Sequence, residues 1–590
     1  MTDDATTVPG GDGHHHPALD SEIDRPDGGS GIDTIVFGVT AVVSLAFVVW
    51  GIFSTESLAS SASSGLSFVV HNFGWLFSLA ASGFVIFVLW LALGKFGRIP
   101  LGRDGEAPEF RTTSWIAMMF SAGMGIGLMF YGVAEPLWHF IGPPPGTPGG
   151  DEALETAMAT TLFHWTLHPW AIYAVVGLAI AYGVFRRGRS LQISAVFTPL
   201  LGEKAVRGWP GRVIDIFAIF ATLFGSATSL GLGALQIGSG LQVVGWVGAV
   251  GNTLLIVIIV ILTIAFILSA VSGVAKGIQW LANINMVLAV VLAFFVFVAG
   301  PTVFILNLIP TTVGSYLQDL AMMAARTDAS GGENMQAWLS SWTIFYWAWW
   351  ISWTPFVGMF IARISRGRTI RQFVTGVLLT PSLVSLVWFA VFGGAALRFQ
   401  STGTDLTEDG QIASENMLFE MLSHLPLEGL TSVLVIILVA IFFVSGADAA
   451  SMVMGTLSER GTLEPSRWNV IFWGAATGAV AAVMLQIGGA DALSGLQNIT
   501  IVAALPFLVI MIGMAASLLR DLRHDPIIVR GRYATAAVEQ AVVTGVSGHG
   551  DDFAIAVEGT EPGHGVGSSM DGRYEATSTG SQPIIDPSTP

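Results

Sequence analysis

Long apolar runs separated by short polar stretches recur along most of this 590-residue chain. A helix needs about 20 apolar residues to cross the hydrocarbon core of a membrane. Each run is long enough, so the pattern predicts an all-α polytopic membrane protein with twelve transmembrane helices. The expected spans are 32–53, 68–94, 112–141, 156–185, 211–245, 251–273, 278–309, 336–362, 370–397, 428–457, 467–487 and 498–520.

Three segments do not fit the spanning pattern. Residues 1–31 are rich in Asp, Gly and Pro, and we expect a disordered acidic N-terminal tail. Residues 521–590 carry four arginines against ten acidic residues, which predicts an acidic C-terminal tail. The segment 315–327 is too short to span and has apolar residues at helical spacing, so we expect a helix in the outer interface.

Composition agrees with a membrane protein whose main surroundings are lipid. Apolar residues make up 53% of the chain and charged residues only 11%, about half the charge of a soluble protein. The net charge of −16 does not indicate a basic partner, because much of the acid lies in the two tails. Nothing here suggests nucleic-acid binding. The absence of cysteine excludes disulfides and thiolate metal sites.

The distribution of lysine and arginine predicts the orientation in the membrane. If the N-terminus is cytoplasmic, the inner loops hold 17 of the 25 basic residues, the outer loops two and the tails six. Short cytoplasmic loops hold the positive charge of membrane proteins. We therefore expect both termini on the cytoplasmic side and 521–590 as a cytoplasmic tail.

The eighth run contains an aromatic segment with helix-breaking residues. Between residues 338 and 358 the chain has six tryptophans, followed by Pro355 and Gly358. On a helix, Trp347 and Trp350 share one face, while Trp349 and Trp353 share another. An aromatic cage for a small organic cation explains this segment; bulky packing against neighbouring helices is the alternative.

The third run is interrupted as well. Gly123, Gly125 and Gly127 alternate with apolar residues, which is poor helix and permits an unwound backbone. Interrupted segments at corresponding positions of two halves indicate the binding site of a secondary transporter. Spans 3–7, about 112–309, and spans 8–12, about 336–520, are thus predicted to form two inverted five-helix repeats, with 315–327 between them.

The fourth run supplies a second aromatic group. Trp170 and Tyr173 are neighbours on a helix, but Trp165 joins them only if Pro169 kinks the segment. A desolvated ring face stabilises a quaternary ammonium by up to ~2 kcal/mol. No acidic residue accompanies these rings, which favours a zwitterion over a simple cation. Backbone N–H groups of 122–127 are candidates to receive its carboxylate.

Several segments resemble the betaine/choline/carnitine transporter family. They are SAGMGIGLMFYG (Ser121–Gly132), HWTLHPWAIY (His164–Tyr173), ATLFGSATSLGLG (Ala221–Gly233), FYWAWWISWTPFVGMFIARISRGR (Phe345–Arg368) and FFVSGADAASMVMG (Phe442–Gly455). The resemblance covers about residues 32–525. It implies a leucine-transporter-like inverted repeat in the last ten spans, a homotrimer in a bacterial inner (plasma) membrane, and uptake of betaine-like osmolytes by alternating access.

The resemblance also implies roles for individual residues. The ammonium cage would be formed by Trp165, Trp170, Tyr173 and Trp350. The pathway would be lined by Trp347, Trp349 and Trp353, and the flexible stretch facing the substrate would be Gly123, Gly125 and Gly127.

Sodium is the expected coupling ion, and no other cofactor is expected. By similarity, one sodium ion would be held by Ser121, Met124, Phe442 and Ser445, and a second by Thr222, Ser226 and Phe356. The family pattern has two adjacent hydroxyl residues at the first site, whereas this chain has Ser445 followed by Gly446. One oxygen ligand is missing there, and a sodium ion with fewer oxygens binds more weakly.

These observations predict a sodium-driven symporter for glycine betaine or a related compatible solute. A carrier for ectoine, proline, choline or carnitine with different ion coupling stays open. An ion channel or a membrane enzyme is the alternative of another class, although no Ser/His/Asp set, metal-spaced histidine cluster or phosphate loop indicates an enzyme. Glu135 and Asp448 lie at membrane depth, and we expect each to pair within the bundle.

Overall fold

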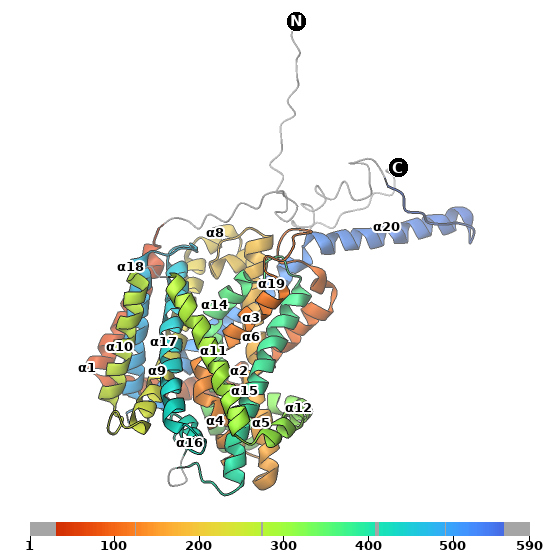
Figure 1. Cartoon of the computed structure of the whole chain (residues 1–590). Coiled ribbons are helices and arrows are strands. Elements are labelled where there is room, and N and C mark those ends of the chain that lie inside the picture. The colour runs from red at the N-terminus through yellow and green to blue at the C-terminus, as the bar shows by residue number, and fades with distance from the viewer. Residues whose placement is uncertain (1–30, 124, 273–274, 408–411, 490, 560–590) are drawn as a thin grey trace.

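The computed structural model describes residues 31–123, 125–272, 275–407, 412–489 and 491–559. Long helices run side by side through a single bundle (Figure 1). Within the described residues the regular structure is helical, apart from one isolated bridge between Pro100 and Thr369. The all-α class is therefore confirmed for this part of the chain. Almost all of the expected N-terminal tail, 1–31, lies outside the described residues.

The helix bounds follow the apolar runs closely. The first eleven α-helices are α1 (Thr34–Phe53), α2 (Thr55–Leu93), α3 (Thr112–Gly123), α4 (Ile126–Ile141), α5 (Ala153–Trp165), α6 (Leu167–Ala181), α7 (Thr198–Leu201), α8 (Glu203–Val206), α9 (Trp209–Val243), α10 (Asn252–Ser272) and α11 (Ala275–Ala299). The remaining nine are α12 (Thr302–Ala324), α13 (Asp328–Ser341), α14 (Thr343–Arg363), α15 (Ile370–Ser401), α16 (Met417–Ser423), α17 (Glu428–Ser458), α18 (Arg467–Ile487), α19 (Ala492–Arg523) and α20 (Pro526–His549).

Nine helices of the described residues are long and apolar enough to cross a membrane, or ten if the bent pair of α11 and α12 is one span. A multi-pass membrane protein is thus supported, while the count of twelve stays a prediction. The two expected spans that do not qualify are the third and the eighth. The third is divided into α3 and α4, of 12 and 16 residues, and the eighth, α14, is rich in tryptophan and hydroxyl residues, which lower its hydropathy.

The seventh expected span ends earlier than the sequence predicted. The helix stops at Ala299, and α12 starts at Thr302 with a bend of 108° between the two. Pro301 restricts the preceding residue and has no N–H to continue the helix. The expected interfacial helix at 315–327 is therefore the second part of a longer helix that begins at residue 302, and the span expected at 278–309 does not continue straight through.

The interruption of the eighth span also lies at another position. The helix α14 runs unbroken through Pro355, and the irregular backbone is at Trp342, with φ −122° and ψ −85°. A proline leaves the carbonyl four residues earlier without its helical partner. Here the Thr354 hydroxyl donates to the Ile351 carbonyl at 2.6 Å, which satisfies that oxygen and keeps the helix intact.

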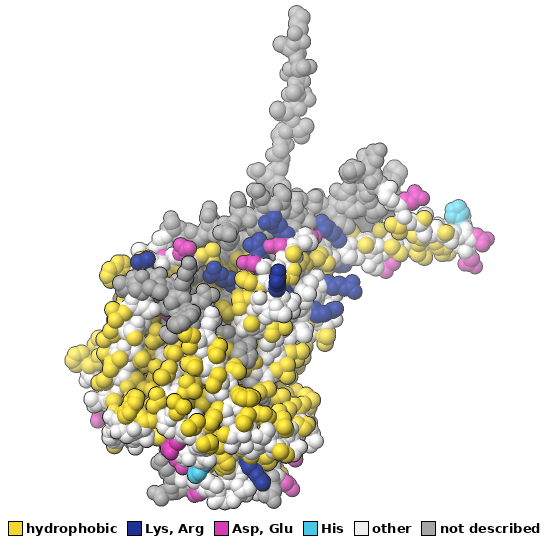
Figure 2. Space-filling view, viewed as in Figure 1, with side chains coloured by type: hydrophobic (Ala, Val, Ile, Leu, Met, Phe, Trp, Pro, Cys, Tyr) yellow, Lys and Arg dark blue, Asp and Glu magenta, His cyan; other side chains and the backbone are white. Residues whose placement is uncertain are grey.

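Basic side chains gather at one end of the bundle, the end at which α20 lies (Figure 2). There the fully buried Arg186 donates from Nη2 to Asp525 at 2.9 Å and from Nη1 to the Gly102 carbonyl at 2.8 Å. Tyr182 also donates to Asp525, at 2.9 Å. Asp525 caps the start of α20 as well. The buried pair of Arg186 and Asp525 therefore joins α20, which lies in the expected C-terminal tail, to the bundle.

Candidate functional site: an aromatic cavity

A cavity of about 60 Å³ lies where α4, α5, α6, α9, α14 and α15 meet, larger than the ~10–15 Å³ that one water needs. Its lining residues are Gly125, Ile126, Gly127, Leu128, Trp165, Pro169, Trp170, Tyr173, Ser229, Trp349, Trp350, Trp353, Val357 and Ser385. None of these lining residues carries a charge. The lining residues offer a solute aromatic rings, aliphatic side chains, the hydroxyl-bearing side chains of Tyr173, Ser229 and Ser385, and backbone.

The four rings expected to form the ammonium cage lie together at this cavity. Trp350 contacts Trp165 with ring centroids 4.9 Å apart and Tyr173 at 6.2 Å. Tyr173 in turn meets Trp170 at 5.3 Å. All three contacts are edge-to-face, with interplanar angles between 69° and 75°. Rings at such angles present faces in several directions around one space.

The bend that brings Trp165 to the other rings lies at Thr166. This residue separates α5 from α6 with φ −118° and ψ −110°. Pro169 is the third residue of α6 and disturbs the helix about one turn before itself. The sequence predicted a kink caused by Pro169, and the irregular residue is three positions earlier, where the Thr166 hydroxyl bonds the Leu162 carbonyl at 2.6 Å.

Three tryptophans of α14 that line the cavity donate their indole N–H groups to the protein. Trp350 donates to the His164 carbonyl at 3.0 Å, and Trp349 donates to the Ser229 hydroxyl at 3.1 Å. Trp353 donates to the Gly225 carbonyl at 2.9 Å. These bonds fix the ring orientations and leave the faces, rather than the polar edges, for a ligand.

The start of α4 faces the same cavity. Its first residues line the cavity, and its N-cap residue, Gly125, has no side chain to cap the helix. Helix N-termini carry unpaired N–H groups and a partial positive charge that bind anions. Gly127 is the residue that permits the close approach, because a Cβ there would lie 2.7 Å from Trp349 and 2.9 Å from Trp165.

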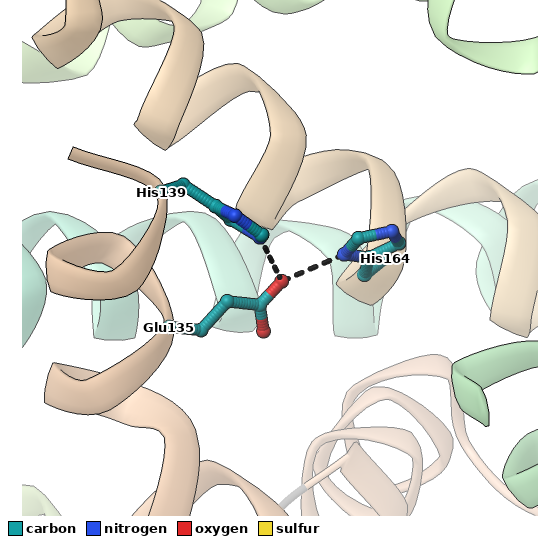
Figure 3. A group of neighbouring side chains, drawn as sticks. All are labelled: Glu135, His139 and His164. Atoms are coloured by element: carbon teal, nitrogen blue, oxygen red, sulfur yellow. Dashed lines mark hydrogen bonds and ion pairs between the residues drawn. The ribbon is translucent and has the colours of Figure 1, made fainter. Parts of the chain in front are cut away.

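A hydrogen bond to the buried side chain of Glu135 orients the Trp165 ring. Oε2 of Glu135 accepts hydrogen bonds from the Trp165 indole at 2.6 Å and from the Tyr346 hydroxyl at 2.5 Å. Oε1 of Glu135 lies 2.7 Å from His164 Nδ1, and His164 Nε2 lies 2.9 Å from the Thr343 hydroxyl. Glu135 is fully buried. The expected pairing of Glu135 within the bundle is therefore observed. Its contact with His164 joins α4 to α5 (Figure 3), and its bond from Tyr346 joins α4 to α14.

Other expected site residues lie elsewhere. Trp347 stacks on His168, with centroids 5.2 Å apart, and does not line the cavity. Gly123 ends α3, and its surroundings are not described. Met124 lies outside the described residues. Asp448 is half-buried in α17, where no hydrogen bond or ion pair involves it among the described residues, so the expected pairing is not seen.

Comparison with known proteins identifies the family. The sequence model of one protein family, the betaine/carnitine/choline family transporter, matches residues 35–527 of this chain. The chain is 47% identical to the betaine/ectoine transporter LcoP of Corynebacterium glutamicum, over 94% of this chain and 88% of that protein. It is 46% identical to the glycine betaine transporter OpuD of Bacillus subtilis, over 83% of this chain and 94% of that protein. The chain belongs to the betaine/carnitine/choline transporter family. It is a transporter and not an enzyme.

The sodium-ligand residues expected in this transporter are only partly described. Thr222 and Ser226 lie one turn apart on α9 and are buried, and the ring of Phe356 meets Trp353 at 5.6 Å. In the other group, Phe442 and Ser445 lie on α17, and the Ser445 hydroxyl bonds the Ile441 carbonyl at 2.9 Å. The side chain of Ser121 is not described. A Cβ at Gly446 would meet nothing within 4 Å.

Sequence reasoning missed three features of the site. Ser229 and Ser385 line the cavity from α9 and α15, and no spacing in the sequence indicated which hydroxyls of those helices face inward. The support of Trp165 by Glu135 was also missed, because the two residues are 30 positions apart. The available signal was a glutamate at membrane depth. It indicated a functional residue but not which residue the glutamate contacts.

Proposed function

We propose that this transporter is a sodium-coupled symporter that takes up glycine betaine or a related compatible solute by alternating access around the aromatic cavity. The single observation that carries the proposal is a cavity walled by the rings of Trp165, Trp170, Tyr173 and Trp350, without a charged lining residue. Ring faces attract a methylated ammonium. The uncapped start of α4 offers N–H groups to a carboxylate at the same cavity.

A zwitterion fits this arrangement better than a simple cation does. A buried cation such as choline would be uncompensated, because no carboxylate lines the cavity. Glycine betaine brings its own negative charge and can direct it toward α4. Names of relatives support the same class, since one is a glycine betaine transporter and another a betaine/ectoine transporter.

Ectoine is the second candidate substrate. It combines a carboxylate with a delocalised cation that is planar rather than tetrahedral, and a planar cation can stack on ring faces. The relative with 47% identity is a betaine/ectoine transporter. Competition of labelled betaine uptake by ectoine, proline, choline and carnitine will rank these solutes.

Sodium coupling is supported by one buried oxygen and by energetics. Among the described residues the buried Ser352 hydroxyl has no hydrogen-bond partner, and the Ser352 side chain lies against Gly225, next to Ser226. Hydroxyl oxygens such as those of Ser352, Thr222 and Ser226 are ligands that suit a hard cation. A charge crossing 100 mV gains ~2.3 kcal/mol, and a tenfold gradient adds ~1.4 kcal/mol. Two ions would thus supply ~7 kcal/mol.

We also propose the membrane arrangement that this function needs. It comprises twelve crossings in two inverted five-helix repeats, a trimeric assembly and both termini in the cytoplasm of a bacterium. The gathering of basic side chains at the end of the bundle near α20 supports the orientation. The chain has no cysteine, so single introduced cysteines will give unambiguous labelling of each side and unambiguous cross-links between protomers.

Uptake of labelled glycine betaine into a transport-deficient bacterial host tests the proposal. We expect saturable uptake that falls to background when potassium replaces sodium. Thr222→Val should weaken the response to sodium while leaving substrate selectivity unchanged. Uptake that does not depend on sodium would refute the coupling, and a lack of betaine uptake with normal ectoine uptake would favour the second substrate.

A further inference from the structure

Beside the cavity, and not part of its lining, Glu135, His139 and His164 bring three potential metal ligands together (Figure 3). One carboxylate oxygen and one ring nitrogen of each histidine all lie within 4.8 Å of one another. We propose that this cluster is a binding site for a divalent transition-metal ion of the zinc type, and that occupation of the site inhibits transport.

The distances suit an ion with nitrogen and oxygen ligands. Ligand atoms around a tetrahedral zinc ion, with bonds of about 2.0–2.1 Å, lie about 3.3 Å apart. Glu135 Oε1 and His139 Nε2 are 3.4 Å apart. Glu135 Oε1 and His164 Nδ1 are closer, at 2.7 Å, because they share a hydrogen. An ion would replace that hydrogen, and a separation wider by about 0.6 Å would suffice.

Two of the three ligands, Glu135 and His164, are already held by partners on the side away from the ion. The second carboxylate oxygen of Glu135 is bound by Trp165 and Tyr346, which leaves Oε1 for an ion. Nε2 of His164 lies 2.9 Å from the Thr343 hydroxyl, which leaves Nδ1 for an ion. Metal-binding histidines and carboxylates typically have such supporting partners, which fix the tautomer and the orientation.

His139 provides the independent sign of a missing ligand. It is fully buried, and within the described part of the chain neither of its ring nitrogens makes a hydrogen bond. A buried polar group without a partner costs about 1–3 kcal/mol. His139 and Glu135 are four residues apart on α4, a spacing that puts both side chains on one face of a helix and is used by paired metal ligands.

The charge balance favours a cation at Glu135. Among the described residues Glu135 has ion-pair contacts only with the two histidines and none with Lys or Arg. The nearest opposing charge comes from Arg326, whose guanidinium lies 5.2 Å from the Trp338 ring, while that ring lies 5.6 Å from His139. Arg326 should therefore weaken cation binding without preventing it.

Inhibition follows from the elements that the site joins, and this step rests on the proposed function. The ligands belong to α4 and α5, and their supporting partners Thr343 and Tyr346 belong to α14. These are the helices that carry the cavity. Alternating access requires them to rearrange, so an ion that fixes α4 to α5 should slow the transport cycle.

Binding is tested first on the purified full-length transporter, in the absence of substrate. The parent protein has His14, His15 and His16 replaced by serine and carries no histidine tag, since that tract could bind metal itself. Titration with Co²⁺ should give one equivalent of bound ion with the strong visible absorption of tetrahedral cobalt, and Zn²⁺ should displace it.

Three variants separate the cluster from other histidines. His139→Phe keeps a ring of similar size and should weaken binding by ~10–100-fold. His424→Phe is the matched control, because the partly exposed His424 at the end of α16 forms the same i,i+4 pair with Glu420 at 3.6 Å, and binding should not change. Arg326→Gln should tighten binding by ~5-fold, a gain that a folding defect would not produce.

Transport is then measured in proteoliposomes with the same proteins. Zn²⁺ should inhibit betaine uptake by the parent, and His139→Phe should retain uptake and lose the inhibition. No stoichiometric Co²⁺ binding by the parent, or equal binding by His139→Phe, would overturn the metal site whatever the substrate is. Normal binding without inhibition would overturn the inhibitory role alone, and a failure of betaine uptake with intact Co²⁺ binding would count against the proposed function.

Discussion

Trp165 lies between two neighbouring environments: a cavity without charged lining residues on one side and the carboxyl group of Glu135 on the other. Its ring faces the cavity, where the lining residues are uncharged and the surfaces are aromatic. Its N–H points to Glu135, which accepts hydrogen bonds from Trp165 and Tyr346 and lies 2.7 Å from Nδ1 of His164. Under the proposed function the cavity attracts a charge that arrives with the substrate, whereas the residues around Glu135 provide hydrogen-bond partners for a polar group that the protein itself has buried. The comparison teaches that the uncharged cavity depends on a polar group that it does not contain.

Loss of the carboxylate should have the largest effect. Glu135→Leu would leave Trp165, Tyr346 and His164 without their acceptor. Each buried group left without its partner costs about 1–3 kcal/mol. We expect a lower unfolding temperature in detergent and no uptake. The control is His139→Phe, which removes ring nitrogens without hydrogen bonds and should leave stability unchanged or higher. Equal stability of both variants would show that the cluster does not support the cavity.

Loss of one cage ring should have the next largest effect. Trp350→Leu removes a face worth about 2 kcal/mol to a quaternary ammonium, which corresponds to about a 30-fold rise in the KM for betaine. Trp347→Leu is the matched control, because Trp347 stacks on His168 away from the cavity. It should lower stability and leave KM nearly unchanged. A larger rise in KM for Trp347→Leu than for Trp350→Leu would contradict the geometry.

A methyl group at the start of α4 should have a moderate effect. In Gly127→Ala the new Cβ would lie 2.7 Å from Trp349 and 2.9 Å from Trp165, so the rings must shift. Overpacking of this kind costs about 1–3 kcal/mol, and we expect about a tenfold rise in KM. Gly125→Ala meets nothing within 4 Å and should have the smaller effect. Comparable KM values for the two variants would argue against close ring packing at Gly127.

The smallest expected effect is a gain. Gly446→Ser would restore a hydroxyl next to Ser445, where a Cβ meets nothing within 4 Å. One additional oxygen ligand should contribute about 1 kcal/mol, so the sodium concentration for half-maximal uptake should fall about fivefold. Measurement of uptake against sodium concentration decides this. An unchanged or raised value would show that Gly446 does not face a sodium ion.

The aromatic cavity was predictable because the residues that indicate it lie close together in the sequence. Tryptophans at helical spacing and a run of glycines are visible in short segments, and the cage rings Trp165, Trp170, Tyr173 and Trp350 do lie together. Most of the long helices were predictable for the same reason, since long apolar runs indicate them, whereas bounds such as the start of α2 at Thr55 and the end of α11 at Ala299 were not.

Details that depend on a single hydrogen bond were not predictable. The sequence placed a break near Pro355, and the Thr354 hydroxyl removes the cause of that break. The bend at Gly300 and Pro301 had a signal in the dipeptide itself, but the apolar run continues across it and hid the boundary. The support of Trp165 by Glu135 joins separate helices, and a single sequence does not show such pairs.

The attachment of α20 determines how the C-terminal region can be shortened. A chain that stops before Asp525 would strand the guanidinium of Arg186 inside the protein, with only the Gly102 carbonyl and the half-exposed Asp104 to receive it. Damage from such a deletion would be a folding defect, easily mistaken for lost regulation. Deletions that begin after His549 leave the anchor untouched and can report on the distal residues alone.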